Sequence, residues 1–511
     1  MRQLQLAATP LFRRCCCTAA TGTERSCRTM LSGKKTRSAA ILAMGRLTDV
    51  VFPLLRAFLL ARMLPQAEFG LAITLSVMAA LVELSTDIGL DRYAVVNADR
   101  ESVVSRGTMH SLSVLRGAII GLLLAVTGPL AGWAFDRPDA WWAFSLLGLA
   151  SFIRGFMHLG IKEAMRDYRF WPEGVTLAAA QTVWTGLSVL FALLLDDYRC
   201  MLFGILGAQV AFVAVSHLTS RTEWRLRWSG EAATTILRFS LPLVPNGMSL
   251  AFRHMADRLI VGAFMSLTAA AVYNINMMIA LTPRNIIQSF VTSVALPVFA
   301  QHESGERPIA RLYPTWAIAL AAIGAIYGAG VICLAEPLVT LIFGARFAID
   351  QIFMTLTGLM VAIKIIYGLP VPPSLAVGDT KFILFGTMAA LGSPLFGLVS
   401  ASITPDLDIF VAAMCVGELL GLLSVAWRCT NRYGFHVADV WLSVLVPVFM
   451  LAALGFVLYE ADPGLWMRIA IFCLFGAICG AAMLFALVRT GVPVRTLLRR
   501  KAPRAPAEKQ G

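Results

Sequence analysis

The chain has 511 residues, of which 58% are hydrophobic and 14% are charged, and its formal net charge is +13. Soluble domains carry about 25% charged residues, so this composition excludes a soluble globular protein and indicates an integral membrane protein. The basic residues are spread over short loops and both tails, which excludes a nucleic-acid partner and favours contacts with anionic lipid headgroups.

The amino-terminal residues 1–38 are basic and contain no long apolar run. A secretory signal peptide needs an apolar core of about 7 to 15 residues, so we expect a disordered cytoplasmic tail instead. Met30 is an alternative translation start, because the sequence that follows it also resembles the beginning of a membrane protein. The chain contains ten cysteines but no Cys-x-x-Cys pair, and we predict neither a metal site nor a cofactor.

Apolar segments follow at regular spacing, and each is close to the roughly 20 residues with which a helix crosses a bilayer. This pattern predicts an all-α integral membrane protein with about 14 transmembrane helices. No predicted loop is long enough for a folded catalytic domain, which argues against an oligosaccharide polymerase or ligase and favours a transporter that is not an enzyme. The predicted spans cover roughly residues 39–63, 70–97, 109–135, 138–160, 172–195, 199–219, 233–265, 268–300, 310–334, 348–372, 378–402, 406–428, 440–460 and 465–488.

The loop charges predict the orientation, because cytoplasmic loops of membrane proteins are enriched in Lys and Arg. If the amino terminus is cytoplasmic, most basic loop residues, such as Lys162 and Arg225, also face the cytoplasm. Arg62 and Arg346 are among the few on the outer side, where the loops are rich in acids. An even number of spans returns the basic tail 489–511 to the cytoplasm, so we predict that both termini are cytoplasmic.

Two segments of the chain resemble each other at an offset of about 202 residues. Each has a basic residue, Arg56 or Arg258, then an apolar run, a short turn and a new helix. We interpret them as a parallel repeat with a cavity between two lobes. The predicted domains are an N-terminal lobe over 39–219, a C-terminal lobe over 233–428 and two added helices over 440–488. The segments are LLRAFLLARMLPQAEFGLAITLSVMAALVEL from Leu54 and MADRLIVGAFMSLTAAAVYNINMMIALTPRN from Met255.

Charged residues within the predicted spans indicate where function lies, because a charge at membrane depth costs at least about 2.5 kcal/mol. The cations are Arg46, Arg56, Arg116, Arg253, Arg258, Arg284 and Lys364. The acids are Asp49, Glu83, Asp87, Asp257 and Glu418. This surplus of cations predicts a cavity that attracts an anion, and arginine matches pyrophosphate oxygens with two parallel hydrogen bonds.

Salt bridges are the structural alternative for these groups. The basic face of the first predicted span can pair with the acidic face of the second, and Arg253 can pair with Asp257 one helical turn away. Glu418 can bind a coupling cation or form an interhelical hydrogen bond.

Several stretches are similar to bacterial polysaccharide transporters, the lipid-linked oligosaccharide flippases of the multidrug/oligosaccharidyl-lipid/polysaccharide exporter superfamily. The stretches are ARMLPQAEFGLAITLSVMAALVELSTDIGL, FSLPLVPNGMSLAFRHMADRLIVGAF, AVYNINMMIALTPRNIIQSFVTSVALPVFA, LIFGARF and SLAVGDTKF, within about residues 40–430. The resemblance implies a two-lobed transporter of the bacterial inner membrane that moves polyprenyl-pyrophosphate-linked sugars to the outer leaflet by alternating access.

The resemblance leaves the glycan and the driving ion open, with protons and sodium as candidates, and it suggests polysaccharide polymerases and glycosyltransferases as partners. Two alternatives belong to the same superfamily. A peptidoglycan-precursor flippase also fits the spans and the cationic interior. A cation-coupled multidrug antiporter needs buried acids more than buried cations, which is contrary to the charges in the predicted spans.

Overall fold

The computed structural model describes residues 47–96, 103–167, 169–241, 244–303, 309–376, 379–433 and 437–489. Arg46, residues 1–38 and residues 490–511 lie outside this part of the chain, and the predictions made for them stay predictions. The described residues are almost entirely α-helical and contain no β-strand, which confirms the predicted fold class.

The elements alternate between long helices and short connecting ones. After a first helix over residues 47–63, the order is α2 (Gln66–Ser85), α3 (Leu90–Val96), α4 (Val103–Ala134), η2 (Pro138–Ala140), α5 (Trp141–Gly155), α6 (Gly160–Arg166), α7 (Trp171–Leu195), α8 (Arg199–Thr219), α9 (Gly230–Ser240), α10 (Val244–Phe264), α11 (Leu267–Glu303), α12 (Ile309–Phe343), η4 (Ala345–Phe347), α13 (Gln351–Ile366), α14 (Val371–Ala376), α15 (Thr380–Ala389), α16 (Gly392–Ile403), α17 (Leu407–Tyr433), α18 (Val437–Ala461) and α19 (Leu465–Arg489).

Ten of the described helices are long and apolar enough to cross a membrane, and a bent pair, 138–155 with 160–166, brings the number to eleven. The protein is therefore a multi-pass membrane protein, while the count of fourteen spans stays a prediction. Three charged residues, Arg253, Asp257 and Arg258, keep α10 out of this set although it has 21 residues.

Several of the predicted spans are divided between two helices. The predicted span 70–97 ends as a helix at Ser85 and resumes as α3, because Gly89 adopts φ +67° and its N–H is bonded to the Asp87 carboxylate at 2.9 Å. The span 138–160 breaks after α5, and the span 378–402 divides into α15 and α16. Apolar composition continues through these breaks, so the sequence pattern did not reveal them.

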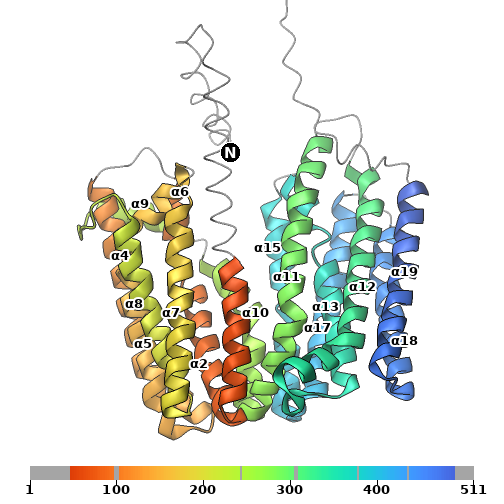
Figure 1. Ribbon diagram of the computed structural model, residues 1–511. Helices are drawn as coiled ribbons and strands as arrows, with labels where there is room; N and C mark the ends of the chain where they lie inside the picture. Colours follow the sequence, from red (N-terminus) through yellow and green to blue (C-terminus); the bar gives the residue numbers. More distant parts are fainter. Residues whose placement is uncertain are drawn as a thin grey trace, which may run out of the picture.

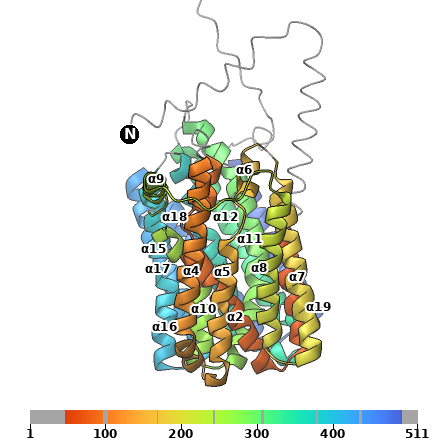
Figure 2. The same ribbon diagram turned by 90° about the vertical axis from the view of Figure 1, so that its left-hand side faces the viewer.

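The helices form two bodies, which lie close together at one face and farther apart at the other (Figure 1). The N-terminal body contains the first helix and α2 to α9, and the C-terminal body contains α11 to α19. The turns at residues 64–65 and 265–266 lie at the first of these faces, which we call the hairpin face. The short helices α6 and α9 lie at the other, the α9 face (Figures 1 and 2). The helix α10 packs against α2 in the N-terminal body and against α11 and α16 in the C-terminal body, so it connects the two.

The two bodies share a hydrophobic core near the hairpin face. Leu64 and Phe69 of the N-terminal body are buried in one cluster with Leu267, Phe343 and Phe347 of the C-terminal body. The rings of Phe69 and Phe347 meet edge to face, with 5.8 Å between their centroids. A Cβ at Gly70 would overlap the carbonyl oxygen of Leu267, so only glycine allows this approach of the two backbones.

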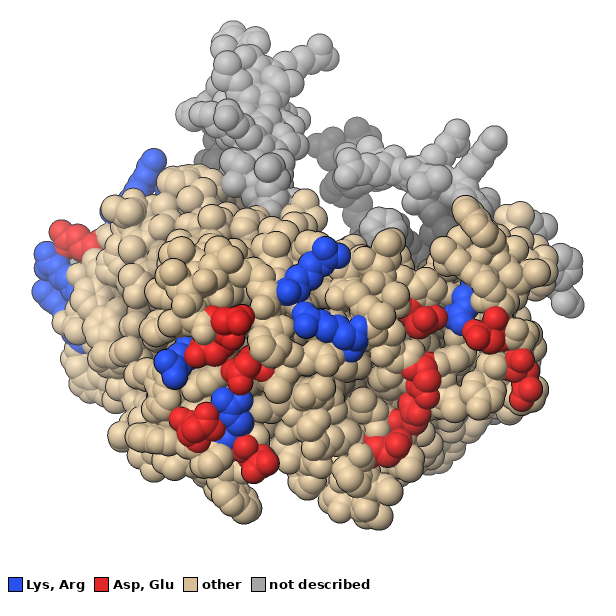
Figure 3. Space-filling model, turned by 60° about the horizontal axis from the view of Figure 1, so that its bottom comes forward, with Lys and Arg blue, Asp and Glu red and all other residues tan. Residues whose placement is uncertain are grey.

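Charged groups are also distinctive at the hairpin face. Figure 3 brings this face forward and shows groups of acidic side chains on it, with basic ones between them. Glu68 and Asp139 are two of the acids, and both are paired with Arg137, at 2.9 and 3.0 Å. The sequence predicted acidic loops for the outer side of the membrane, so we expect the hairpin face to be the outer one.

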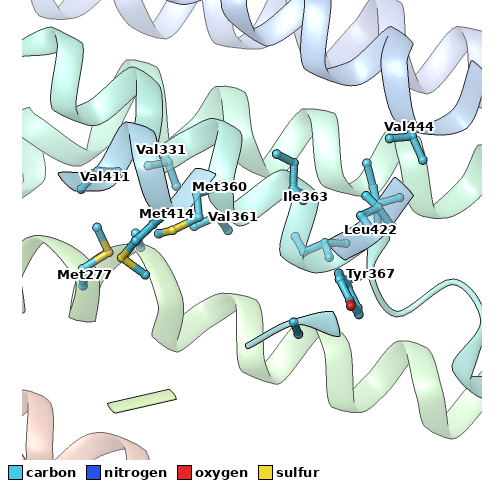
Figure 4. Packing of buried hydrophobic residues seen from close by; sticks show 14 of the residues in the cluster. Met277, Val331, Met360, Val361, Ile363, Tyr367, Val411, Met414, Leu422 and Val444 are labelled. Atoms are coloured by element: carbon cyan, nitrogen blue, oxygen red, sulfur yellow. The ribbon is translucent and has the colours of Figure 1, made fainter. Parts of the chain in front are cut away.

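The C-terminal body has its own core, which supports the buried charges described below. Met360, Val361 and Ile363 of α13 pack with Leu422 of α17 and with Tyr367 (Figure 4). These side chains hold α13 and α17 side by side and fix the position of the polar residues that lie between them.

Candidate functional site

A cluster of charged side chains lies inside the C-terminal body, and α10, α11, α13 and α17 contribute one residue each. The Glu418 carboxylate is fully buried and accepts hydrogen bonds from Arg253 Nη2 at 2.8 Å and from Lys364 Nζ at 3.2 Å. Arg253 and Glu418 are about three helical turns, or roughly 16 Å, from the hairpin-face ends of their helices. The ion pairs therefore lie deep within these helices.

Arg284 adds a further cation to this cluster. Its guanidinium donates to the carbonyl oxygen of Lys364 and to Asn285 Oδ1, both at 3.0 Å, and its side chain is 7% exposed. Within the described part of the chain, its Nε has no hydrogen-bond partner. Three cations thus surround one carboxylate, and we call Arg253, Arg284, Lys364 and Glu418 the C-terminal cation cluster.

The cluster opens on a cavity of about 100 Å³, which Arg253, Arg284 and Lys364 line together with Gln288 and Tyr367. The guanidinium of Arg253 lies over the Tyr367 ring, 4.6 Å from its centroid, and the Tyr367 hydroxyl donates to the carbonyl oxygen of Gly386 at 2.8 Å. This stacking and the bond to Glu418 hold the Arg253 fork in one orientation. The arrangement is suited to bind an anion of phosphate type.

The expected pair of Arg253 with Asp257 is not the one the structure contains. Arg253 extends to Glu418 on another helix, and the Asp257 carboxylate accepts a hydrogen bond from the Tyr273 hydroxyl at 2.8 Å. Arg258, one position further along α10, has a buried Nε without a partner among the described residues and does not line the cavity of the cluster. Arg253 and Asp257 therefore bond to residues of other helices and not to each other.

Arg56 occupies a separate site in the N-terminal body. Its guanidinium lies 3.9 Å from the centroid of the Trp184 ring and donates to Thr185 Oγ1 at 3.4 Å and to Gln181 Oε1 at 3.5 Å. Gln181 in turn donates to Asp49 Oδ1 at 3.3 Å. Arg56 of the first helix therefore contacts α7 and not the acids of α2. The pairing proposed for Arg46 lies outside the described residues and stays a prediction.

A second cavity, of about 370 Å³, lies in the N-terminal body, and we call it the N-terminal cavity. Its polar lining includes Glu83 and Asp87, which were expected to pair with the first helix, and Arg116. Glu83 pairs with Arg154 at 3.5 Å, and Arg116 donates to the carbonyl oxygen of Glu83 at 2.9 Å. Those of the predicted cations that the structure describes are thus distributed over separate places and do not share one cavity.

Two arginines at the hairpin face connect the bodies, and the sequence had marked them only as exceptions in outer loops. Arg62, at the end of the first helix, donates to the carbonyl oxygen of Ile342 in α12 at 3.0 Å. Arg346, just beyond α12, donates to the carbonyl oxygens of Ala61 and, at 3.3 Å, Leu64 in the first helix and its turn. Each arginine caps the carboxyl end of a helix in the other body, where carbonyl groups lack intrahelical partners.

The signal for this contact was present in both segments, because a basic residue in or after the last turn of a helix favours capping of free carbonyls. What the sequence did not contain was the identity of the helix to be capped. The two capping arginines, Arg62 and Arg346, hold the hairpin face closed.

Comparison with known proteins identifies a matching family and similar proteins of polysaccharide biosynthesis. The model of the family described as "Polysaccharide biosynthesis protein" matches residues 59–349. The teichuronic acid biosynthesis protein TuaB of Bacillus subtilis is 20% identical, over 92% of this chain and 98% of its own length. The succinoglycan biosynthesis transport protein ExoT of Rhizobium meliloti is 21% identical, over 72% of this chain and 74% of its own length.

Solved structures show the same fold at low identity. A lipid II flippase, MurJ, in an inward closed conformation superposes with a TM-score of 0.65 and 13% identity, over 90% of this chain and 100% of that one. An inward-facing multidrug resistance transporter of the MATE family within the MOP superfamily has a TM-score of 0.53 and 14% identity, over 79% of this chain and 95% of that one. These likenesses show the fold of the superfamily that the sequence resembles.

Proposed function

This chain belongs to the polysaccharide biosynthesis protein family, and we propose that it translocates a polyprenyl-pyrophosphate-linked oligosaccharide across the bacterial inner membrane by alternating access. The oligosaccharide serves exopolysaccharide, capsule or O-antigen biosynthesis. The names of two relatives support a polysaccharide pathway, since one is a teichuronic acid biosynthesis protein and the other a succinoglycan transport protein.

The observation that carries the proposal is the surplus of positive charge in the C-terminal cation cluster. Glu418 offsets one of three cations, and Arg284 is bonded only to neutral groups in the described chain. Unpaired charges are costly inside a membrane unless water or a counter-ion reaches them. A pyrophosphate group supplies several negative oxygens to a fork of arginine donors, so the cluster would stabilise the head of a lipid carrier there.

The closed hairpin face supports the direction of transport. If this face is the outer one, the cavities are reached from the α9 face, which is then cytoplasmic, and the structure represents an inward-facing state. Binding of the lipid head would be followed by separation of the bodies at the hairpin face and approach at the α9 face. Protons or sodium ions as the driving force, and polymerases and glycosyltransferases as partners, remain parts of the proposal.

A second candidate is a peptidoglycan lipid-precursor flippase, which the superposition with a lipid II flippase favours. Its substrate also contains pyrophosphate, so the C-terminal cation cluster fits both candidates and the glycan distinguishes them. A cation-coupled multidrug antiporter is less well supported, because the cluster would repel a cationic drug.

The test is a flipping assay with the full-length protein in liposomes. The probes are undecaprenyl pyrophosphate bearing an uncharged disaccharide with a fluorescent label, and labelled lipid II. Wild-type protein should expose the first probe on the opposite leaflet, and Arg284→Gln should reduce the rate at least about tenfold. This substitution leaves no carboxylate unpaired, because Arg284 has no ion pair in the described part of the chain.

Arg225→Gln is the matched control, since the Arg225 side chain is exposed and pairs with the exposed Glu223. It should leave the rate unchanged. Equal flipping by wild type and Arg284→Gln would overturn the role of the cluster. Flipping of lipid II alone would replace the proposed function with the second candidate.

A further inference from the structure

The N-terminal cavity is a polar space that the pyrophosphate site does not use. Its volume of about 370 Å³ lies within the range of small-ligand pockets, roughly 300–1,000 Å³. Helices α2, α4, α5 and α8 form its walls, and Met255 of α10 completes them. The cavity is not fully enclosed, so a ligand can reach it.

The charges that line this cavity nearly cancel, unlike those of the C-terminal cation cluster. Its carboxylates are Glu83, Asp87 and Asp91, and its cations are Arg116 and Arg154. Arg154 is 3.5 Å from Glu83. Asp91 is 3.0 Å from Lys162, which does not line the cavity. A pyrophosphate would meet carboxylates here, so the lining favours a ligand without net charge.

The three carboxylates come from three successive segments of the chain. Glu83 lies near the end of α2, Asp87 lies in the turn that Gly89 permits, and Asp91 lies in the first turn of α3. In the described chain, no group of three or more His, Cys, Asp or Glu side chains is placed to hold a metal ion. A space of this size with separated acceptors suits an extended ligand with several hydroxyl groups.

The lining also has donors and acceptors for such a ligand. The Gln209 carboxamide accepts from Arg154 Nη1 at 3.4 Å and has an NH₂ group with two donors. Arg116 Nε is buried and has no partner among the described residues. Carboxylates accept hydrogen bonds from sugar hydroxyls, while guanidinium and amide groups donate to hydroxyl and ring oxygens. The set can therefore bind both the donors and the acceptors of a sugar.

The two cavities lie on different sides of one helix. Arg253 lines the cavity of the C-terminal cation cluster, and Met255 lines the N-terminal cavity. Two residues along an α-helix correspond to a rotation of about 200°, so these side chains leave α10 on nearly opposite sides. His254, between them, is exposed. The proposal below requires a single molecule along this side of α10 to contact both cavities.

We propose that the N-terminal cavity is the glycan subsite: it binds the uncharged, hydroxyl-rich sugars next to the pyrophosphate, while the C-terminal cation cluster binds the pyrophosphate itself. This inference rests on the proposed function. The division assigns sugar selectivity to the N-terminal body and the affinity for the lipid carrier to the C-terminal body.

The test compares the binding of two lipids to the full-length protein in detergent. One is undecaprenyl pyrophosphate, and the other is the same lipid bearing cellobiose. Asp87→Asn keeps the side-chain oxygen that accepts from the Gly89 N–H, and Gln209→Met keeps the length of the side chain. Each variant should weaken binding of the cellobiose lipid about tenfold and change binding of the sugar-free lipid less than about twofold.

Asp197→Asn is the matched control, because Asp197 also accepts a backbone N–H, that of Arg199 at 2.9 Å, but lies at the hairpin face. It should affect neither lipid. Arg284→Gln should weaken both lipids equally, which would place the loss in the shared pyrophosphate.

Two results would overturn the subsite while the proposed function stands. One is unchanged binding of both lipids by Asp87→Asn and Gln209→Met, and the other is equal weakening of both lipids by these variants. Wild-type protein that binds neither lipid would instead overturn the proposed function, and the subsite with it.

Discussion

The hairpin face and the α9 face differ in what their polar contacts connect. At the hairpin face, Arg62 and Arg346 bond across the two bodies, each to carbonyl groups at the end of a helix. At the α9 face, Lys162 bonds to Asp91 at 3.0 Å and to Glu173 at 2.6 Å, all within the N-terminal body. The arginine contacts at the hairpin face therefore join the two bodies, whereas the Lys162 contacts at the α9 face stabilise the N-terminal body alone.

This difference indicates which contacts must break during transport. A hydrogen bond from a charged donor contributes about 1.5–3 kcal/mol, and less when the donor is exposed, as Arg62 and Arg346 are. Each 1.4 kcal/mol changes the ratio of closed to open forms about tenfold. Substitutions at the hairpin face should therefore change the distance between the bodies, whereas substitutions at the α9 face should change stability only.

Gly70→Ala should have the largest effect, because the new Cβ overlaps the Leu267 carbonyl and two backbones must separate. Double electron–electron resonance measures the separation between two spin labels. The labels are attached to ketone-bearing amino acids at Asp139 and Thr404, which are exposed and belong to different bodies. The distribution should move to longer distances. Gly186→Ala is the control, since a Cβ there meets no atom within 4 Å. An unchanged distribution in Gly70→Ala would contradict the close approach.

Arg346→Gln should have the next largest effect, because it removes donors to the carbonyl groups of both Ala61 and Leu64. We expect a longer mean distance between the same labels and a fraction of open molecules raised about tenfold. Arg225→Gln, on the α9 side, should show the wild-type distribution. Identical distributions for the two variants would mean that the Arg346 bonds do not hold the bodies together.

Arg62→Gln should open the hairpin face less, since Arg62 makes a single bond between the bodies, to Ile342 at 3.0 Å. The open fraction should lie between those of wild type and Arg346→Gln. The same resonance measurement ranks the variants, and an effect of Arg62→Gln that exceeds that of Arg346→Gln would reverse the assignment.

Glu173→Gln should not change the distance between the labels, because Glu173 is 2% exposed and bonded to Lys162 within one body. It should lower the melting temperature of the protein in detergent, since Lys162 loses one of its two carboxylate partners. Thermal unfolding followed by fluorescence measures this change. A longer label distance without loss of stability would show that the α9 face also controls closure.

The sequence predicted the helical membrane fold well, because long apolar segments have few alternatives in a bilayer. It predicted the charged residues of the site but not their partners. Arg253 and Glu418 are 165 positions apart, and only the packing of α10 against its neighbours brings them together. The local partner, Asp257, was one turn away and bonds to Tyr273 instead.

Chain breaks were missed for a related reason. The turn at Gly89 depends on one residue with positive φ within a segment of continuing apolar character. That turn interrupts the acidic face predicted for the second span, and Glu83, before the turn, and Asp87, within it, both line the N-terminal cavity. Arg56 was predicted as a cation within a span, but its contact with Trp184 on α7 depends on tertiary packing.

The arginines at the hairpin face are reciprocal, since each body supplies a donor to the other and receives one. When the bodies move apart at this face, both arginines therefore lose their acceptors together. Separation at this face should be all-or-none, with partly open forms scarcely populated, and the membrane would not be crossed by a continuous leak during the change.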